Sequence, residues 1–122
     1  MISYITIGSN DLSASAVFFD ALFSAVNGTR AYSLDKMIGY SFGSERPMII
    51  VTCPYDGEAA SHGNGTMIAL AAKDRTQVDA VHALALKNGA TNEGSPGQRG
   101  RNFYGGYFRD PDGNKFNICL TT

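Results

Sequence analysis

The sequence predicts an α+β fold in which two tandem β-α-β-β-β modules form a half-open, barrel-like cavity. A chain of 122 residues has the length of one domain. A β-rich run, an Asp residue, an amphipathic helix and an Asn-Gly pair follow one another twice, with Asp11 and Asp74 63 positions apart. Short β-rich runs then follow each predicted helix. We therefore expect a single domain, residues 1–122, with module one at 1–55, a linker at 56–64 and module two at 65–122.

The first predicted helix begins after Asp11 and ends at Asn27-Gly28. The Asp11 side chain can accept hydrogen bonds from the free N–H groups of the first turn, and its charge suits the positive end of the helix dipole. We expect Gly28 to adopt the left-handed conformation that closes the helix. Apolar residues recur at spacings of three and four and form one stripe: Leu12, Ala16, Phe19, Leu22, Phe23 and Val26.

The second predicted helix begins after Asp74 and ends at Asn88-Gly89. Its first turn has the same kind of cap, and its end has the same stop signal. Its apolar stripe is shorter and consists of Val78, Val81 and Ala85.

The strands are predicted from β-branched and aromatic runs that turn residues separate. They span residues 2–8, 29–34, 37–42 and 48–53 in the first half, and 67–71, 104–109 and 116–120 in the second. Residues 91–100 predict a Gly-rich loop, which leaves one strand of the second module poorly marked. Residues 110–114 predict a tight turn, because Pro presets φ, Gly tolerates a positive φ, and Asp and Asn bond back to the backbone.

Alternation along the strands separates two faces of each predicted sheet. One face carries branched side chains that should pack under the helices and be more buried than their neighbours: Ile5, Ile7, Ile68 and Leu70. The other face is polar, small or flexible and should line a cavity; it carries Tyr4, Thr6, Met67, Asn117 and Cys119.

Composition and charge exclude several classes of protein. Apolar residues make up 43% of the chain and charged residues 17%, which supports a real core and argues against disorder. A net charge of −1 lacks the positive field that nucleic acid or an anionic membrane would require, and no apolar run could span a bilayer. Cys53 and Cys119 are too few for a disulfide framework and are not spaced like a zinc site. With no secretion-signal pattern, these features favour a cytoplasmic protein without nucleic-acid or membrane partners.

Three groups of residues resemble the vicinal oxygen chelate superfamily, which includes glyoxalase I, bleomycin-resistance proteins, fosfomycin-resistance enzymes and extradiol dioxygenases. The first group consists of residues 5–12 and 18–23, and the second of residues 63–70, 78–82 and 95–99. The third, residues 107–115, is the most specific of the three. The second group is similar to a small glyoxalase-like branch. The similarity spans essentially the whole chain and implies the same two-module fold as the internal repeat.

Members of this superfamily typically hold a divalent metal through His, Glu and sometimes Gln on the opening and closing strands. The resemblance puts these positions on Tyr4, Met67 and Asn117, and residues 48–53, which close module one, contain no His or carboxylate. A phenol, a thioether and a carboxamide do not supply the charge and hardness that such a cation requires. We therefore predict no metal, no cofactor and no metal-dependent catalytic residue.

The resemblance still implies a ligand cavity. In some relatives, the residues at the positions of Thr6 and Tyr107 line this cavity. We predict a pocket lined by Tyr4, Thr6, Met67, Tyr107, Asn117 and Cys119. The tyrosines are as consistent with filling the barrel as with binding a ligand, and Met67 is more typical of packing. Cys119 is more typical of an inert buried thiol than of a nucleophile, because nothing near it in the sequence would lower its pKa.

Four further polar residues lie outside this set. Arg99 and Arg101 precede the strand at 104–109 and could clamp an anion over the cavity mouth, although a solvated basic loop is the simpler explanation. His62 lies in the Gly-rich linker and should be exposed. His82 follows the stripe of the second helix and should be a surface or half-buried residue.

Three functions remain open at this point. We favour a metal-independent small-molecule-binding protein, because the predicted cavity face mixes polar and apolar residues. The alternatives are a glyoxalase-like lyase or dioxygenase with a rearranged metal site, and a structural subunit whose cavity side chains fill. The free strand edges of a half-open barrel favour a homodimer. The module repeat further predicts that Tyr4, Met67 and Asn117 meet at one centre, held by packing and a hydrogen bond.

Overall fold

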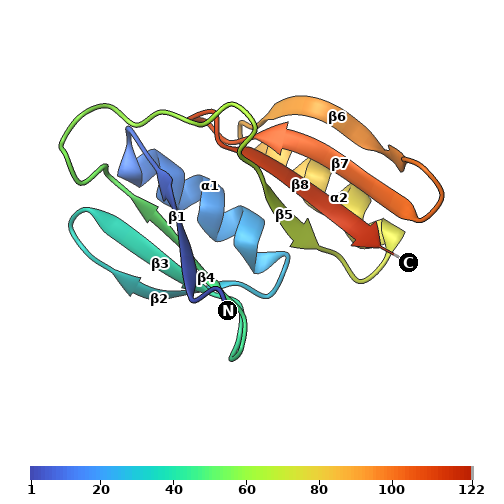
Figure 1. The fold of residues 1–122 in the computed structure, drawn as a ribbon, viewed down its shortest axis with the longest axis horizontal. Coiled ribbons are helices and arrows are strands. Elements are labelled where there is room, and N and C mark those ends of the chain that lie inside the picture. The colour runs from blue at the N-terminus through green and yellow to red at the C-terminus, as the bar shows by residue number, and fades with distance from the viewer. Residues whose placement is uncertain (122) are drawn as a thin grey trace.

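The computed structural model describes residues 1–121 as two β-α-β-β-β modules (Figure 1). The first contains β1 (Tyr4–Gly8), α1 (Leu12–Ser24), β2 (Thr29–Ser33), β3 (Met37–Ser41) and β4 (Met48–Thr52). The second contains β5 (Ile68–Ala71), α2 (Arg75–Lys87), β6 (Thr91–Gln98), β7 (Phe103–Arg109) and β8 (Lys115–Thr121). This order confirms the predicted α+β fold.

Each module forms one four-stranded sheet, and the two sheets have the same connectivity. Their strand orders are β1-β4-β3-β2 and β5-β8-β7-β6. In each sheet the first strand lies at an edge and pairs in parallel with the last, while the other pairs are antiparallel. Figure 1 shows the two sheets side by side, with α2 behind the second. Within residues 1–121, β1 and β5 therefore each leave one backbone edge unpaired.

Both helices begin at the predicted aspartates. The Asp11 carboxylate accepts a hydrogen bond from the Ala14 N–H (3.1 Å), and the Asp74 carboxylate accepts one from the Gln77 N–H (2.8 Å). Each bond satisfies a donor that has no partner inside its helix. α2 ends as predicted, because Gly89 is left-handed with a φ of 103°. Neither of these helices, the two found in residues 1–121, is long and apolar enough to cross a membrane.

The end of α1 differs from the prediction for Gly28. The left-handed residue is Asn27, with a φ of 65°, whereas Gly28 has no positive φ. Gly28 is required because a Cβ atom there would lie 2.7 Å from the Phe42 ring and 2.8 Å from the Phe23 Cβ. Its N–H donates to the Phe23 carbonyl (2.7 Å), which brings the chain back against the helix. The Asn-Gly pair does stop the helix, but Asn27 adopts the left-handed turn and Gly28 makes the close approach.

The segment predicted as a Gly-rich loop, residues 91–100, contains the edge strand β6. It pairs antiparallel with β7, and its register shifts between Asn92 and Gly94 and again between Gly94 and Gly97. The loop prediction was wrong because the segment has no apolar alternation to mark it as a strand. Pairing with β7, rather than burial of its own side chains, keeps it extended.

The predicted strand register is confirmed. Ile7 and Leu70 are buried, Ile5 and Ile68 are partly buried, and each is less exposed than the residues beside it on the strand. The branched side chains of β1 and β5 therefore lie on the helix side of the sheets, and the alternate residues lie on the other side.

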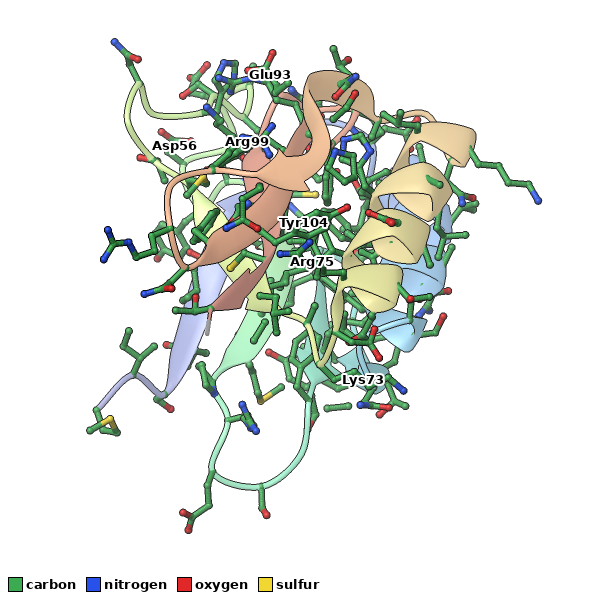
Figure 2. The ribbon with its side chains drawn as sticks, turned by 90° about the vertical axis from the view of Figure 1, so that its right-hand side faces the viewer. Asp56, Lys73, Arg75, Glu93, Arg99 and Tyr104 are labelled. Atoms are coloured by element: carbon green, nitrogen blue, oxygen red, sulfur yellow. The ribbon has the colours of Figure 1, made fainter. Side chains whose placement is uncertain are left out.

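One continuous hydrophobic core joins the two modules. The rings of Phe19 and Phe23 in α1 lie 5.7 and 6.4 Å, between centroids, from the Phe116 ring in β8. At the start of α2, the Arg75 guanidinium lies over the Tyr104 ring of β7, 4.8 Å from its centroid (Figure 2). Helix α1 thus contributes to the cores of both sheets.

Polar contacts join the modules at the predicted turn between β7 and β8. The turn is closed by the Asp110 carboxylate, which accepts the backbone N–H groups of Asp112 and Asn114 (2.9 and 2.8 Å). The Asp112 carboxylate accepts the Asn10 N–H (2.9 Å) and the Ser15 hydroxyl (3.2 Å) of the first module. The Asn114 amide donates to a carbonyl of β1 (3.0 Å). The turn is therefore also a connection between the modules.

Candidate functional site

The sheet faces turned away from the helices carry the residues predicted for the cavity. On the first sheet, Tyr4 is 57% exposed and Thr6 is exposed. Met67, immediately before β5, is 43% exposed. These faces are therefore open, and they present apolar side chains beside polar ones.

The open face of the second sheet brings together one aromatic ring and two cations. The Arg99 guanidinium carbon and the Lys115 ammonium lie 5.1 and 5.5 Å from the centroid of the Tyr107 ring. Asn117 is the register partner of Tyr107, and Ala69 is the partner of Asn117 on the next strand. We call Arg99, Tyr107, Lys115 and Asn117 the Tyr107 cluster. Two of its members, Tyr107 and Asn117, are predicted site residues.

Arg99 is held in place by backbone carbonyls. Its guanidinium donates to the carbonyls of Gly97, Gly105 and Ser95. Because these acceptors fix its orientation, the side chain lies against the Tyr107 ring and is partly buried. Arg101 is exposed. The simpler prediction, that these arginines belong to a solvated loop, therefore applies to Arg101 but not to Arg99.

His82 supports the cluster from the helix side, a role that the sequence prediction missed. It is 3% exposed, not a surface or half-buried residue. Its Nε2 lies 3.1 Å from the Tyr107 carbonyl and 3.1 Å from the Asn92 Oδ1. The spacing from Val78 to Ala85 contained the signal, because position 82 completes the i, i+3, i+4, i+7 pattern of a buried face. His62, by contrast, is exposed as expected.

The predicted residues on β8 are more enclosed than those on the first sheet. Asn117 is 1% exposed, and its amide nitrogen donates to the Gly106 carbonyl (2.9 Å). Cys119 is partly buried, and this burial raises the pKa of its thiol above the usual value. A raised pKa leaves less thiolate at neutral pH, which disfavours a nucleophilic role.

The predicted meeting of Tyr4, Met67 and Asn117 stays a prediction. Tyr4 lies on the edge strand of one sheet, Met67 lies beside the edge strand of the other, and the two strands do not pair in residues 1–121. Strand pairing places Asn117 next to Tyr107 and Ala69.

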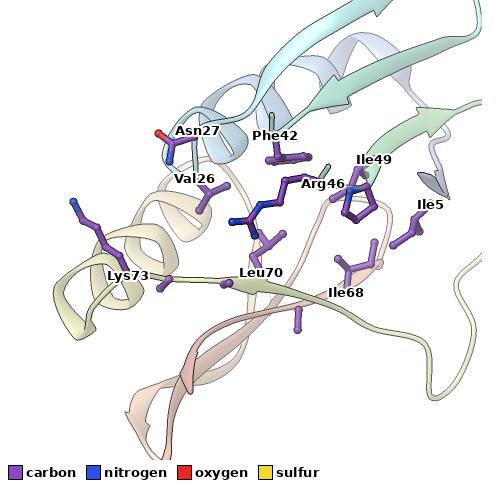
Figure 3. Close-up of a pocket in the computed structure, with 13 residues that line it drawn as sticks. Ile5, Val26, Asn27, Phe42, Arg46, Ile49, Ile68, Leu70 and Lys73 are labelled. Atoms are coloured by element: carbon purple, nitrogen blue, oxygen red, sulfur yellow. The ribbon is translucent and has the colours of Figure 1, made fainter. Parts of the chain in front are cut away.

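A pocket of about 460 Å³ lies elsewhere, between the two modules (Figure 3). None of the six predicted site residues lines it. Its walls are Ile5, Val26, Asn27, Phe42, Arg46, Pro47, Ile49 and the continuous segment 68–73. A smaller pocket of about 130 Å³ lies under the linker and includes Thr6 and His62.

The profile of the Glyoxalase/Bleomycin resistance protein/Dioxygenase superfamily matches residues 1–118. The chain belongs to this family. A glyoxalase/bleomycin resistance protein from Albidiferax ferrireducens T118 is 36% identical to it, with a TM-score of 0.91 over 100% of this chain and 99% of the other. No curated protein matches the sequence.

Two more distant structures of named function share the fold. The fosfomycin resistance protein FosX from Mesorhizobium loti is 19% identical, with a TM-score of 0.74 over 100% of this chain and 92% of its own. Lactoylglutathione lyase from Agrobacterium tumefaciens is also 19% identical, with a TM-score of 0.73 over 98% and 92%. The likeness to these two structures is one of fold, whereas the family match over residues 1–118 confirms the resemblance to the superfamily.

The residues to which the resemblance assigns the superfamily's metal positions do not fit a divalent cation. Tyr4 offers a phenol, Met67 a thioether and Asn117 an uncharged carboxamide, so the set contains no imidazole and no carboxylate. Within residues 1–121, no group of three His, Cys, Asp or Glu side chains lies close enough together to hold a metal ion. No metal-dependent step follows from these residues.

Proposed function

We propose that the protein binds a small organic molecule at the Tyr107 cluster without using a metal ion. The observation that carries this proposal is the Tyr107 ring with Arg99 and Lys115 beside it, on a sheet face that no helix covers. The ring offers a broad apolar surface, and the two cations attract a hydrogen-bond acceptor or an anionic group. Such a mixture of apolar area and a few placed polar groups is typical of ligand sites.

The cluster is also held in one arrangement before any ligand arrives. Three carbonyls fix Arg99, and His82 lies within hydrogen-bond distance of the Tyr107 backbone carbonyl. Side chains that are already ordered lose less conformational entropy when a ligand binds. This preorganisation supports a binding role for the cluster.

We propose further that a second copy of the chain covers the open faces in a homodimer. The exposure of Tyr4 and Met67 and the free edges of β2 and β6 support this arrangement. Tyr4, Thr6 and Met67 would then line the covered site. Light scattering at micromolar concentration should give twice the 13.0 kDa mass of one chain, and a clean monomer would contradict the dimer. A cytoplasmic location remains part of the proposal.

The ligand can be sought with a thermal-shift screen of metabolites and antibiotics. A compound that binds the cluster should lose about tenfold or more of its affinity in Tyr107→Ala, because stacking and cation contacts disappear. Tyr55→Ala is the matched control, since Tyr55 is fully exposed just before the linker. Equal losses in both variants, or none in either, would contradict the assignment to this cluster.

Metal independence is tested by elemental analysis of protein purified without a chelator. We expect no stoichiometric transition metal and unchanged ligand affinity after EDTA treatment. A stoichiometric metal would overturn the proposal and favour the alternative, a glyoxalase-like lyase or dioxygenase with a rearranged metal site.

A further inference from the structure

We infer that the pocket between the modules is a second ligand site, which takes an amphipathic carboxylate with an apolar body and one anionic end. The volume of about 460 Å³ lies within the range of about 300–1,000 Å³ that is typical of small-molecule sites. The site shares no residue with the Tyr107 cluster, so the inference does not depend on the function proposed there.

The pocket has positive charge without negative charge. Arg46 and Lys73 line it, and no Asp or Glu does. The ion pairs within residues 1–121 are Arg30 with Asp20 and Arg109 with Glu93, so neither Arg46 nor Lys73 has an acidic partner there. An anion is the charge that complements such a wall, and a guanidinium matches the two oxygens of a carboxylate.

The polar and apolar linings occupy different parts of the pocket (Figure 3). The Arg46 guanidinium extends into it toward Val26 and Leu70, while Asn27 and Lys73 lie toward one end. Ile5 and Ile68 lie together toward the other end. A ligand with its carboxylate at Arg46 would therefore place an apolar body against the isoleucines, where burial of apolar area stabilises binding.

The wall formed by residues 68–73 explains why the ligand should carry a polar group and not be fully apolar. These residues are consecutive, so the pocket runs along the free backbone edge of β5 and not against one sheet face. A free edge presents N–H and C=O groups that need hydrogen-bond partners, which a purely apolar ligand cannot provide. A carboxylate can accept from such N–H groups as well as from Arg46.

The pocket also lies at a joint between the modules. Ile5 and Ile49 come from the first sheet and the wall 68–73 from the second, and the Gln77 amide of α2 donates to the Ala25 carbonyl just after α1 (2.9 Å). A ligand here would contact both modules at once. It should therefore raise the unfolding temperature, because it binds the folded chain only.

The test uses sodium octanoate as the probe, with 1-octanol as the neutral compound of equal chain length, in isothermal titration calorimetry on the full chain. We expect octanoate to bind at one site per chain and at least tenfold more tightly than octanol. Arg46→Gln should weaken octanoate binding about tenfold and leave octanol binding unchanged, because it removes the charge and keeps most of the side chain. Lys36→Gln is the matched control, an exposed cation in the β2–β3 turn that does not line the pocket.

The location is checked by amide chemical shifts. Octanoate should shift the resonances of residues 68–73 and of Asn27, and Tyr107→Ala should leave these shifts unchanged. Equal affinity for octanoate and octanol, or an unaffected Arg46→Gln, would overturn the inference. The inference would also be overturned if the resonances of residues 68–73 changed with protein concentration and not with added octanoate. A second copy of the chain would then occupy the pocket.

Discussion

The two histidines of the chain have opposite environments, and this difference decides their roles. His82 is enclosed between α2 and the second sheet, with Nε2 3.1 Å from the Tyr107 carbonyl and 3.1 Å from Asn92. Its ring also packs against Phe108, at 6.1 Å between centroids. His62 lies exposed in the linker. A buried ring that fills space and lies within hydrogen-bond distance of two acceptors stabilises the fold in a way that an exposed ring does not.

We expect His82→Ala to lower the free energy of unfolding by about 2–4 kcal/mol, since it opens a cavity and leaves the Tyr107 carbonyl without this partner. Hydrogen exchange in β6 should accelerate in this variant, because Asn92 loses its contact with the helix. Urea denaturation measures the first effect. His62→Ala should stay within about 0.5 kcal/mol of the parent protein, and a comparable loss there would contradict this account.

Asp20 carries a pH-dependent contact. The Arg30 guanidinium makes two hydrogen bonds to its carboxylate (2.8 and 2.7 Å) and lowers the pKa of that carboxyl below its usual value. The Tyr40 hydroxyl donates to the same group (2.8 Å). Because the folded pKa is lower than the unfolded one, the pair stabilises the protein above the unfolded pKa of 3.8, and this contribution is lost as the pH falls through the folded pKa.

Asp20→Asn should therefore reduce stability at pH 7 by about 0.5–1 kcal/mol, a small effect because both side chains are nearly half exposed. The difference from the parent protein should shrink as the pH is lowered below 3.8. Thermal unfolding across a pH series measures it. Asp35→Asn, in the exposed β2–β3 turn, serves as the control, and a difference that grew in acid would contradict the assignment.

At the scale of elements, the two helix ends differ in which residue adopts the left-handed conformation and which allows a close approach of the backbone. α2 stops through a left-handed Gly89, as a Gly after a helix usually does. α1 stops through a left-handed Asn27, because Gly28 is occupied with the close approach of Phe23 and Phe42. The sequence signal is the same Asn-Gly pair in both places, so only the packing around it distinguishes the two ends.

Two substitutions test this division at the end of α1. Asn27→Gly should be neutral or stabilising by up to about 1 kcal/mol, because Gly adopts a positive φ without strain. Gly28→Ala should destabilise by about 1–3 kcal/mol, because its Cβ would overlap the two Phe side chains. Chemical denaturation measures both. The reverse order would show that Gly28, and not Asn27, is the left-handed residue.

At the scale of the whole molecule, one core serves both modules. Phe116 in the second sheet packs against Phe19 and Phe23 in the first module and stacks on Phe108, at 5.6 Å between centroids. The β7–β8 turn adds polar contacts across the same junction. Neither module could unfold without exposing apolar surface of the other, which favours a single cooperative transition.

We expect far-UV circular dichroism and tyrosine fluorescence to report one coincident unfolding transition. Phe116→Ala should shift both by the same amount, about 3–5 kcal/mol, because the ring is fully buried. Val17→Ala is the control on α1, since Val17 is 69% exposed. Two separate transitions, or a shift in only one signal, would show that the modules unfold independently.

The structure brings only some of the predicted site residues together, and the reason is how far apart in the chain the contacting segments lie. Tyr107 and Asn117 are brought together by the antiparallel pairing of neighbouring strands, which alternation and the 110–114 turn already imply. Arg99 joins them through carbonyls of an irregular strand that carries no sequence pattern. The pocket between the modules depends on how two sheets and two helices pack, so no local pattern could indicate Arg46.

The sequence by itself determined the repeated module, the helix starts at Asp11 and Asp74 and the side of each strand that faces the core, because capping and alternation are local effects of neighbouring residues. The resemblance assigns the superfamily's metal positions to Tyr4, Met67 and Asn117, and the mismatch of their donors with a divalent cation remains a prediction, since donor chemistry depends on residue type. Only the tertiary structure decided that β6 is a strand, that His82 is buried and that a cationic pocket opens between the modules. Each of these depends on contacts between segments distant in the chain, and such contacts are set by packing of the whole molecule rather than by any short stretch of it.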